Sequence, residues 1–95
     1  MSFVRLAFSS EVVRRLSELE AGARGVVSSV DTHNPHRTER LLALGITPGA
    51  RVALLQRFPG VVFECDQTEI AVERDVAKAI WVKVDHGDSV RGEES

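Results

Sequence analysis

The chain has 95 residues, 43% of them hydrophobic, and its 12 Lys and Arg against 14 Asp and Glu give a formal charge of −2. This length allows one small domain, and a pI of about 5.9 argues against a nucleic-acid surface, which normally has a strong basic excess. The single cysteine excludes an intramolecular disulfide, and no apolar run approaches the roughly 20 residues that cross a bilayer. The start of the chain lacks the pattern of a secretion signal, so we expect a cytoplasmic protein whose membrane link, if it has one, goes through a partner.

The first 30 residues are predicted to form a short extension followed by the first strand of the main domain. Within the extension, residues 3–8 alternate apolar and polar side chains as a strand does. Ser10 then offers an N-cap for a short helix that ends near Leu16. After a glycine turn, the β-branched run at residues 25–30 is typical of a strand.

A helix is predicted at residues 35–44. Asn34 is a favoured N-cap, and a proline follows at the first helical position, where its fixed φ suits the helix. Gly45 comes next and is free to take the left-handed conformation that satisfies the last carbonyls. Leu41 and Leu44 lie three residues apart, so we expect both to face the core.

The second half of the chain has the pattern of a β-meander. Two-residue loops separate the first three strand-like runs, as in hairpins, and a single polar helical turn precedes the last run. About five short strands with one inserted helix favour a mainly β fold, a small SH3-like barrel, in which closure removes exposed edges. The predicted strands of this half are residues 51–58, 61–65, 68–72 and 79–84.

Three segments follow from this assignment. Residues 1–15 form the N-terminal extension with its short helix, and residues 16–84 form the barrel domain. Residues 85–95 are polar and contain too little apolar surface to order themselves, so they are predicted to be a disordered tail.

The sequence contains no motif of an enzyme. The spacing of a P-loop and that of a nucleophile elbow are both absent. Cys65 is the one candidate nucleophile, and it lies between Glu64 and Asp66, whose carboxylates are expected to raise its pKa and disfavour the thiolate. We therefore interpret Cys65 as a small apolar residue of a strand and predict no catalytic residues.

His33 and His36 are the candidates for a metal site. His33 precedes the N-cap and His36 lies in the first helical turn, so the two rings need not converge. Metal sites usually have three or four ligands with further support behind them. We predict solvated histidines and no cofactor, with a weak divalent metal contact or a partner contact as the alternatives.

Trp81 is the only tryptophan, in a chain without tyrosine. Core packing is the favoured interpretation, because Trp81 is the largest apolar side chain available and one face of its strand must be buried. The alternative is an exposed aromatic anchor on a binding face. Alternation decides between them: if Ile80 and Val82 point inward, Trp81 points out.

From residue 16 to residue 84 the chain resembles the FeoA family, small cytosolic proteins associated with bacterial ferrous iron uptake. Four motifs in the family's order carry the resemblance: LSELEAG at 16–22, RLLALGITPG at 40–49, TEIAV at 68–72 and DVAKAIWV at 75–82. The resemblance implies an SH3-like barrel without catalytic residues, a partner of the FeoB transporter in the membrane. The domain is also similar to the C-terminal SH3-like module of metal-dependent repressors, although the chain has no helix-turn-helix pattern and no basic excess.

These observations leave two hypotheses about function. In the first, the solvent face of the helix at residues 35–44 binds the cytoplasmic part of FeoB through Arg37, Arg40 and Leu42; the competing interpretation of the two arginines is a solvated helix surface. In the second, His33 and His36 bind metal and the chain is a metal-responsive sensor or regulatory module. A groove for proline-rich peptides is poorly supported by so few aromatic residues. Whether the protein activates, inhibits or assembles the transporter, and whether it forms a homo-oligomer, stays open.

Overall fold

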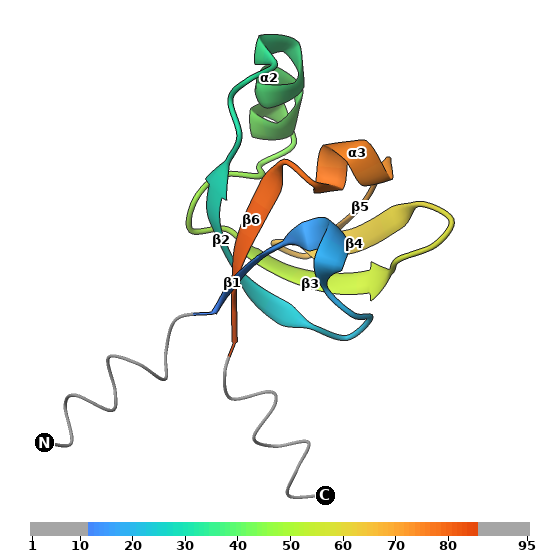
Figure 1. Ribbon diagram of the computed structural model, residues 1–95. Helices are drawn as coiled ribbons and strands as arrows, with labels where there is room; N and C mark the ends of the chain where they lie inside the picture. The colour runs from blue at the N-terminus through green and yellow to red at the C-terminus, as the bar shows by residue number, and fades with distance from the viewer. Residues whose placement is uncertain (1–11, 86–95) are drawn as a thin grey trace, which may run out of the picture.

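The computed structural model describes residues 12–85 of the chain. The described part is a strongly bent, antiparallel sheet of six strands in the order β1-β6-β2-β3-β4-β5, with α2 standing at one end and α3 packed beside the 3₁₀ helix η1 (Figure 1). No helix among these residues is long and apolar enough to cross a membrane. In chain order the elements are β1 (Val13–Arg15), η1 (Leu16–Glu18), β2 (Arg24–Val30), α2 (Pro35–Ala43), β3 (Arg51–Gln56), β4 (Val61–Cys65), β5 (Thr68–Val72), α3 (Arg74–Ala77) and β6 (Ile80–Val84).

The prediction of a short helix before Leu16 is wrong for the part of that segment that the structure describes. The segment Val13–Arg15 is strand β1, which pairs antiparallel with β6 so that Val13 lies opposite Lys83 and Arg15 opposite Trp81. The open edge of β6 supplies backbone partners that outweigh the local helix pattern, and the sheet therefore has six strands. The start of the predicted helix, the predicted strand at residues 3–8 and residues 86–95 of the predicted tail lie outside the described residues.

Helix α2 begins at Pro35 as the sequence predicts, and it ends at Ala43, one residue earlier than predicted. The side chain of Asn34 accepts a hydrogen bond from the backbone N–H of Arg37 (3.1 Å) and caps the helix. At the other end Gly45 has φ +88°, its N–H donates to the Leu42 carbonyl (2.9 Å), and the Ile46 N–H donates to the Leu41 carbonyl (3.0 Å). This pair of bonds is a Schellman motif, which satisfies carbonyls that the helix itself leaves without partners.

The turn after α2 decides which apolar residue enters the core. Leu41 and Ile46 are buried, whereas Leu44 is 49% exposed, so the prediction that Leu44 faces the core is wrong. Leu44 is the C-cap residue, and the left-handed Gly45 reverses the chain so that Ile46 takes the place beside Leu41. The largest fully buried side chains are those of Phe63, Leu16, Leu41, Ile46, Leu54, Ile80, Val27, Val61 and Val82.

The predicted meander of β3, β4 and β5 is confirmed, with a two-residue loop between β4 and β5, whereas the loop between β3 and β4 runs over residues 57–60 and is longer than the two residues predicted. Asp66 and Gln67, with φ +49° and +74°, form the two-residue turn between β4 and β5, which closes on the pair of Cys65 and Thr68. Between β3 and β4 the register shifts after Leu54, because β3 contains one extra residue there. Strand β3 accordingly ends at Gln56 and not at residue 58.

Strands β2 and β6 approach so closely that one position in β2 has no room for a side chain. A Cβ atom added to Gly25 would lie 2.3 Å from the backbone oxygen of Lys83, which cannot move without breaking the pairing of the strands. At Gly60 an added Cβ would meet its nearest atom at 3.6 Å, an ordinary van der Waals distance.

We predict that Gly25→Ala lowers the free energy of unfolding by about 1–3 kcal/mol, because the added methyl group must push β2 from β6. Gly60→Ala is the matched control and should change it by less than about 0.5 kcal/mol. Urea unfolding of both variants measures the difference, and equal stabilities would contradict the close approach of the two strands.

Candidate partner-binding surface

Trp81 faces away from the core and holds two other elements in place. Its neighbours Ile80 and Val82 are fully buried, so by alternation the half-buried Trp81 points to the other face, and the favoured prediction of core packing is wrong. The indole Nε1 donates to Asp31 (3.3 Å), and the guanidinium of Arg15 lies 4.8 Å from the ring centroid. Trp81 thereby connects β1 and the loop after β2 to β6.

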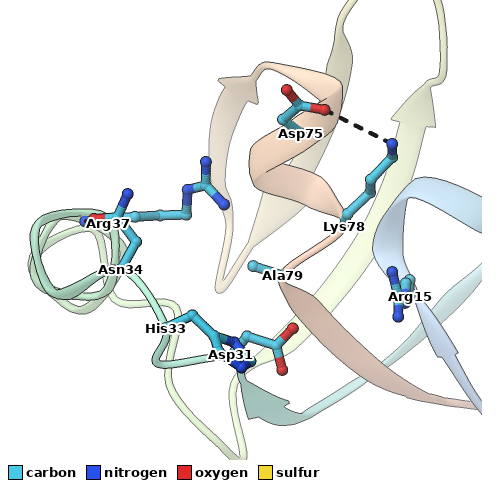
Figure 2. A pocket seen from close by; sticks show the side chains of 8 residues that line it. All are labelled: Arg15, Asp31, His33, Asn34, Arg37, Asp75, Lys78 and Ala79. Atoms are coloured by element: carbon cyan, nitrogen blue, oxygen red, sulfur yellow. Dashed lines mark hydrogen bonds and ion pairs between the residues drawn. The ribbon is translucent and has the colours of Figure 1, made fainter.

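A polar hollow opens beside this aromatic contact (Figure 2). Arg37 extends across it from α2 toward α3, where Lys78 forms an ion pair with Asp75 at 3.7 Å, and Arg15 lies on the far side in this view. The lining combines cations and carboxylates, so the hollow can make polar contacts with a partner or ligand. The lining residues are Arg15, Asp31, His33, Asn34, Arg37, Asp75, Lys78 and Ala79.

A second hollow is a groove of about 450 Å³ between α2, the end of β5 and α3. Its apolar wall includes the half-exposed Leu44, and the two arginines of α2, Arg37 and Arg40, lie along it. The combination of an apolar wall with a basic rim suits a partner that presents apolar and acidic side chains together. The lining residues are Asn34, His36, Arg37, Arg40, Leu41, Leu44, Ala71, Val72, Glu73 and Val76.

The three residues predicted to bind a partner do not share one surface. Arg37 lines both hollows and Arg40 lines the groove, whereas Leu42 lines neither and is 48% exposed elsewhere on α2. Leu44 is not predicted as a groove residue from the sequence, because helical spacing alone places its side chain in the core. The signal was its position just before Gly45, where a helix ends and its side chains can leave the core.

The two candidate metal ligands are not brought together. His33 lines the polar hollow and His36 the groove, and both side chains are exposed. Among residues 12–85 no group of three or more His, Cys, Asp and Glu side chains is placed to hold a metal ion.

Cys65 is buried and its thiol donates a weak hydrogen bond to the Gly45 carbonyl, at 3.7 Å. Burial is the main cause that raises the pKa of this thiol above its ordinary value of 9.0, and the carboxylate of Asp66 raises it further. The sequence alone predicts that the neighbouring carboxylates raise this pKa; in the structure, burial of the thiol contributes more. The thiol is therefore poorly suited to act as a nucleophile.

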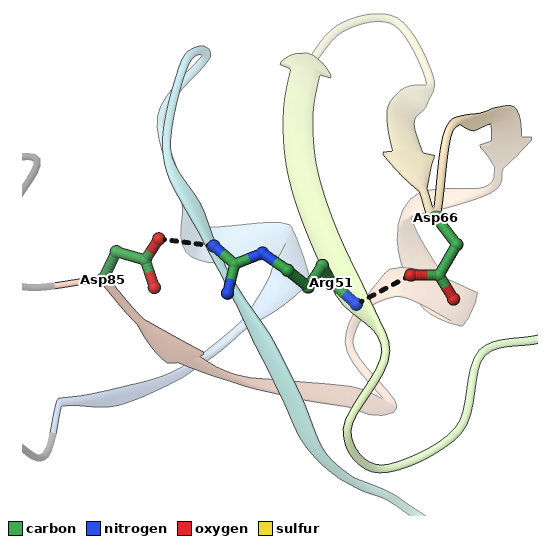
Figure 3. A network of polar contacts seen from close by, with 3 residues as sticks. All are labelled: Arg51, Asp66 and Asp85. Atoms are coloured by element: carbon green, nitrogen blue, oxygen red, sulfur yellow. Dashed lines mark hydrogen bonds and ion pairs between the residues drawn. The ribbon is translucent and has the colours of Figure 1, made fainter.

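A separate cluster of polar contacts around Arg51 has a structural role (Figure 3). The guanidinium of Arg51 pairs with Asp85 at 2.8 Å, and its backbone N–H donates to the Asp66 side chain at 3.2 Å. These contacts join β3 to the end of β6 and to the turn after β4. The Arg51 side chain is 61% exposed, so water screens the ion pair and its contribution to stability is small.

The comparisons with known proteins decide the family. The family model of the FeoA domain matches residues 14–84, about three quarters of the chain. The chain belongs to the FeoA family. A FeoA protein from Chlorobium tepidum solved by NMR is 32% identical, with a TM-score of 0.67, and the match covers 75% of this chain and 70% of that one. No match was found among curated proteins.

Two further solved structures define what this FeoA chain is similar to. The zinc-complexed FeoA of Stenotrophomonas maltophilia, described as an SH3 domain protein, is 31% identical with a TM-score of 0.63, covering 76% of this chain and 89% of that one. The SH3-like fold is thus confirmed. A manganese-dependent transcriptional repressor has a TM-score of 0.73 at 23% identity, which shows a shared fold alone; the match covers 78% of this chain and 42% of the repressor.

The buried thiol gives a prediction about pH. Because the folded protein retains the Cys65 proton at a pH at which the unfolded chain has lost it, this group contributes stability that is complete below about pH 9 and is lost as the pH rises through the raised pKa. We expect the stability of the wild type to fall more steeply above about pH 9 than that of Cys65→Ala. Urea unfolding at a series of pH values measures both slopes; identical slopes would show that the pKa of the thiol does not change on folding.

Proposed function

We propose that this FeoA-family protein is a non-catalytic accessory protein of bacterial ferrous iron uptake that binds the cytoplasmic part of a FeoB-type transporter. Family membership supports the link to ferrous iron transport. The Stenotrophomonas maltophilia relative is described as possibly acting as a bacterial ferrous iron transport activating factor. The described residues present hollows with scattered charges and no convergent catalytic groups, which suits binding better than a reaction.

The observation that carries the proposal is the exposed surface of α2. Leu42 in α2 and Leu44 at its C-cap are each about half exposed, and Arg37 and Arg40 lie beside the groove that Leu44 lines. Leucine exposed to this extent is available for burial by a partner, and arginine is enriched where interfaces bind tightly. We infer that the groove receives an apolar side chain of the transporter, that acidic groups of the transporter pair with the arginines, and that Leu42 contacts the transporter on the other side of the helix.

We predict that Leu44→Glu and Leu42→Glu each weaken binding to the purified cytoplasmic part of the transporter by at least about tenfold, because each places a charge where apolar area must be buried. Leu55→Glu is the matched control, since Leu55 is also 48% exposed but lies in β3. Titration calorimetry with and without GTP measures the affinities, and thermal unfolding verifies that all three variants fold.

If Leu44→Glu folds and binds like the wild type, the groove is not the contact. If Leu42→Glu unfolds, Leu42 has a core role and its assignment to the surface is wrong. If the wild type fails to bind under every condition, the proposed partner is wrong.

The second candidate function is a metal-responsive regulatory module. The specific observation in its favour is the fold shared with a manganese-dependent repressor, together with the zinc in the Stenotrophomonas maltophilia structure. Such a sensor would use His33 and His36, which lie in different hollows of this protein.

We predict that the double variant His33→Ala, His36→Ala binds ferrous iron and zinc no more weakly than the wild type, because among the described residues no third ligand completes a metal site with the two rings. Metal titration followed by calorimetry compares the two proteins. Saturable binding by the wild type that the double variant loses would favour the sensor over the transporter partner.

A further inference from the structure

The loop between β3 and β4 carries an apolar side chain that is mostly exposed to solvent. Phe58 is 66% exposed, more than any other large hydrophobic residue of the described part of the chain. The loop lies at the edge of the molecule beyond the start of α3 (Figure 1). Phe58 lines neither the polar hollow nor the groove, so it belongs to neither surface described above.

Two arginines bracket this ring. The guanidinium of Arg74, at the start of α3, lies 4.3 Å from the centroid of Phe58, and that of Arg57 lies 5.8 Å from it. Arg74 also donates a hydrogen bond to the Arg57 carbonyl (2.9 Å), which fixes α3 against the loop. We name these three residues, Arg57, Phe58 and Arg74, the Phe58 tip.

The positive charge of the Phe58 tip is not compensated within the described residues. Neither arginine forms an ion pair there, and the buried Nε of Arg57 has no hydrogen-bond acceptor. Stacking of the two guanidiniums on the ring leaves their charge available to an outside anion, because the aromatic face neutralises none of it. The chain as a whole has a formal charge of −2, so these two arginines are cations on an acidic protein.

We propose that the Phe58 tip is a weak anchor for the surface of a bilayer that contains anionic lipids. An aromatic ring that projects beyond the domain can enter the boundary between headgroups and acyl chains, where aromatic residues are enriched. Guanidinium groups beside it bind lipid phosphates through paired hydrogen bonds.

The anchor goes beyond the proposed function, since it requires no transporter. It differs from the expectation, drawn from the sequence, that any membrane link goes through a partner. A contact of this kind is weak: each arginine near an anionic surface contributes about fivefold in affinity and the ring about tenfold more.

Sedimentation of the full-length protein with vesicles tests the anchor. We expect the wild type to bind vesicles of phosphatidylcholine with about one third phosphatidylglycerol, to ignore vesicles of phosphatidylcholine alone, and to release when the salt is raised. Phe58→Ala should reduce binding about tenfold, and Arg57→Gln or Arg74→Gln about fivefold each. Arg24→Gln, which removes an exposed arginine of β2, and Leu55→Ala, which truncates a half-exposed leucine of β3, are controls that should bind as the wild type does.

A variant with increased binding protects the test against loss of fold. Tryptophan is favoured over phenylalanine at the membrane interface, so Phe58→Trp should bind anionic vesicles more tightly than the wild type. The proposal is overturned if the wild type does not sediment with anionic vesicles, or if Phe58→Ala binds as well as the wild type. Because no transporter is present, either outcome leaves the binding of Leu44→Glu to the transporter to be judged separately.

Discussion

The position of β6 between β1 and β2 is the constraint on which the rest of the structure depends. Ile80 and Val82 are fully buried on its inner face, so a shift of one residue in register would move both into water and bring Trp81 inward. On the outer face Trp81 contacts Arg15 and Asp31, which fixes the first strand and the loop leading to α2. Arg15 and Asp31 also line the polar hollow, so the shape of this hollow depends on the register of β6.

The end of α2 decides which apolar side chain lines the groove. The Schellman motif at Gly45 sends Ile46 into the core beside Leu41 and leaves Leu44 at the groove. The thiol of Cys65 contacts the carbonyl of the same glycine, so the turn is also held from β4. A groove with one wall on a capped helix and the other on a strand is rigid, which lowers the entropy lost when a partner binds.

The reactive side chains that the sequence singles out lie apart from one another in the described residues. The one thiol is buried with a raised pKa, and His33 and His36 line different hollows. The groove beside α2 and the Phe58 tip share no residue, although α3 contributes Val76 to the first and Arg74 to the second. The two proposed contacts can be tested independently, because the substitutions that remove one leave the residues of the other unchanged.

The sequence by itself determined the features that depend on a few neighbouring residues: the Asn34 cap, the turn at Gly45, the two-residue hairpin after Cys65 and the family. These depend on backbone preferences and on hydrogen bonds between residues a few positions apart, so local patterns are sufficient. Only the tertiary structure decided that Val13–Arg15 forms a strand, that Leu44 is exposed, and that Arg37 joins residues of α3 and β5 in two hollows. Each of these depends on segments far apart in the chain, whose packing overrides the local preference of any one of them.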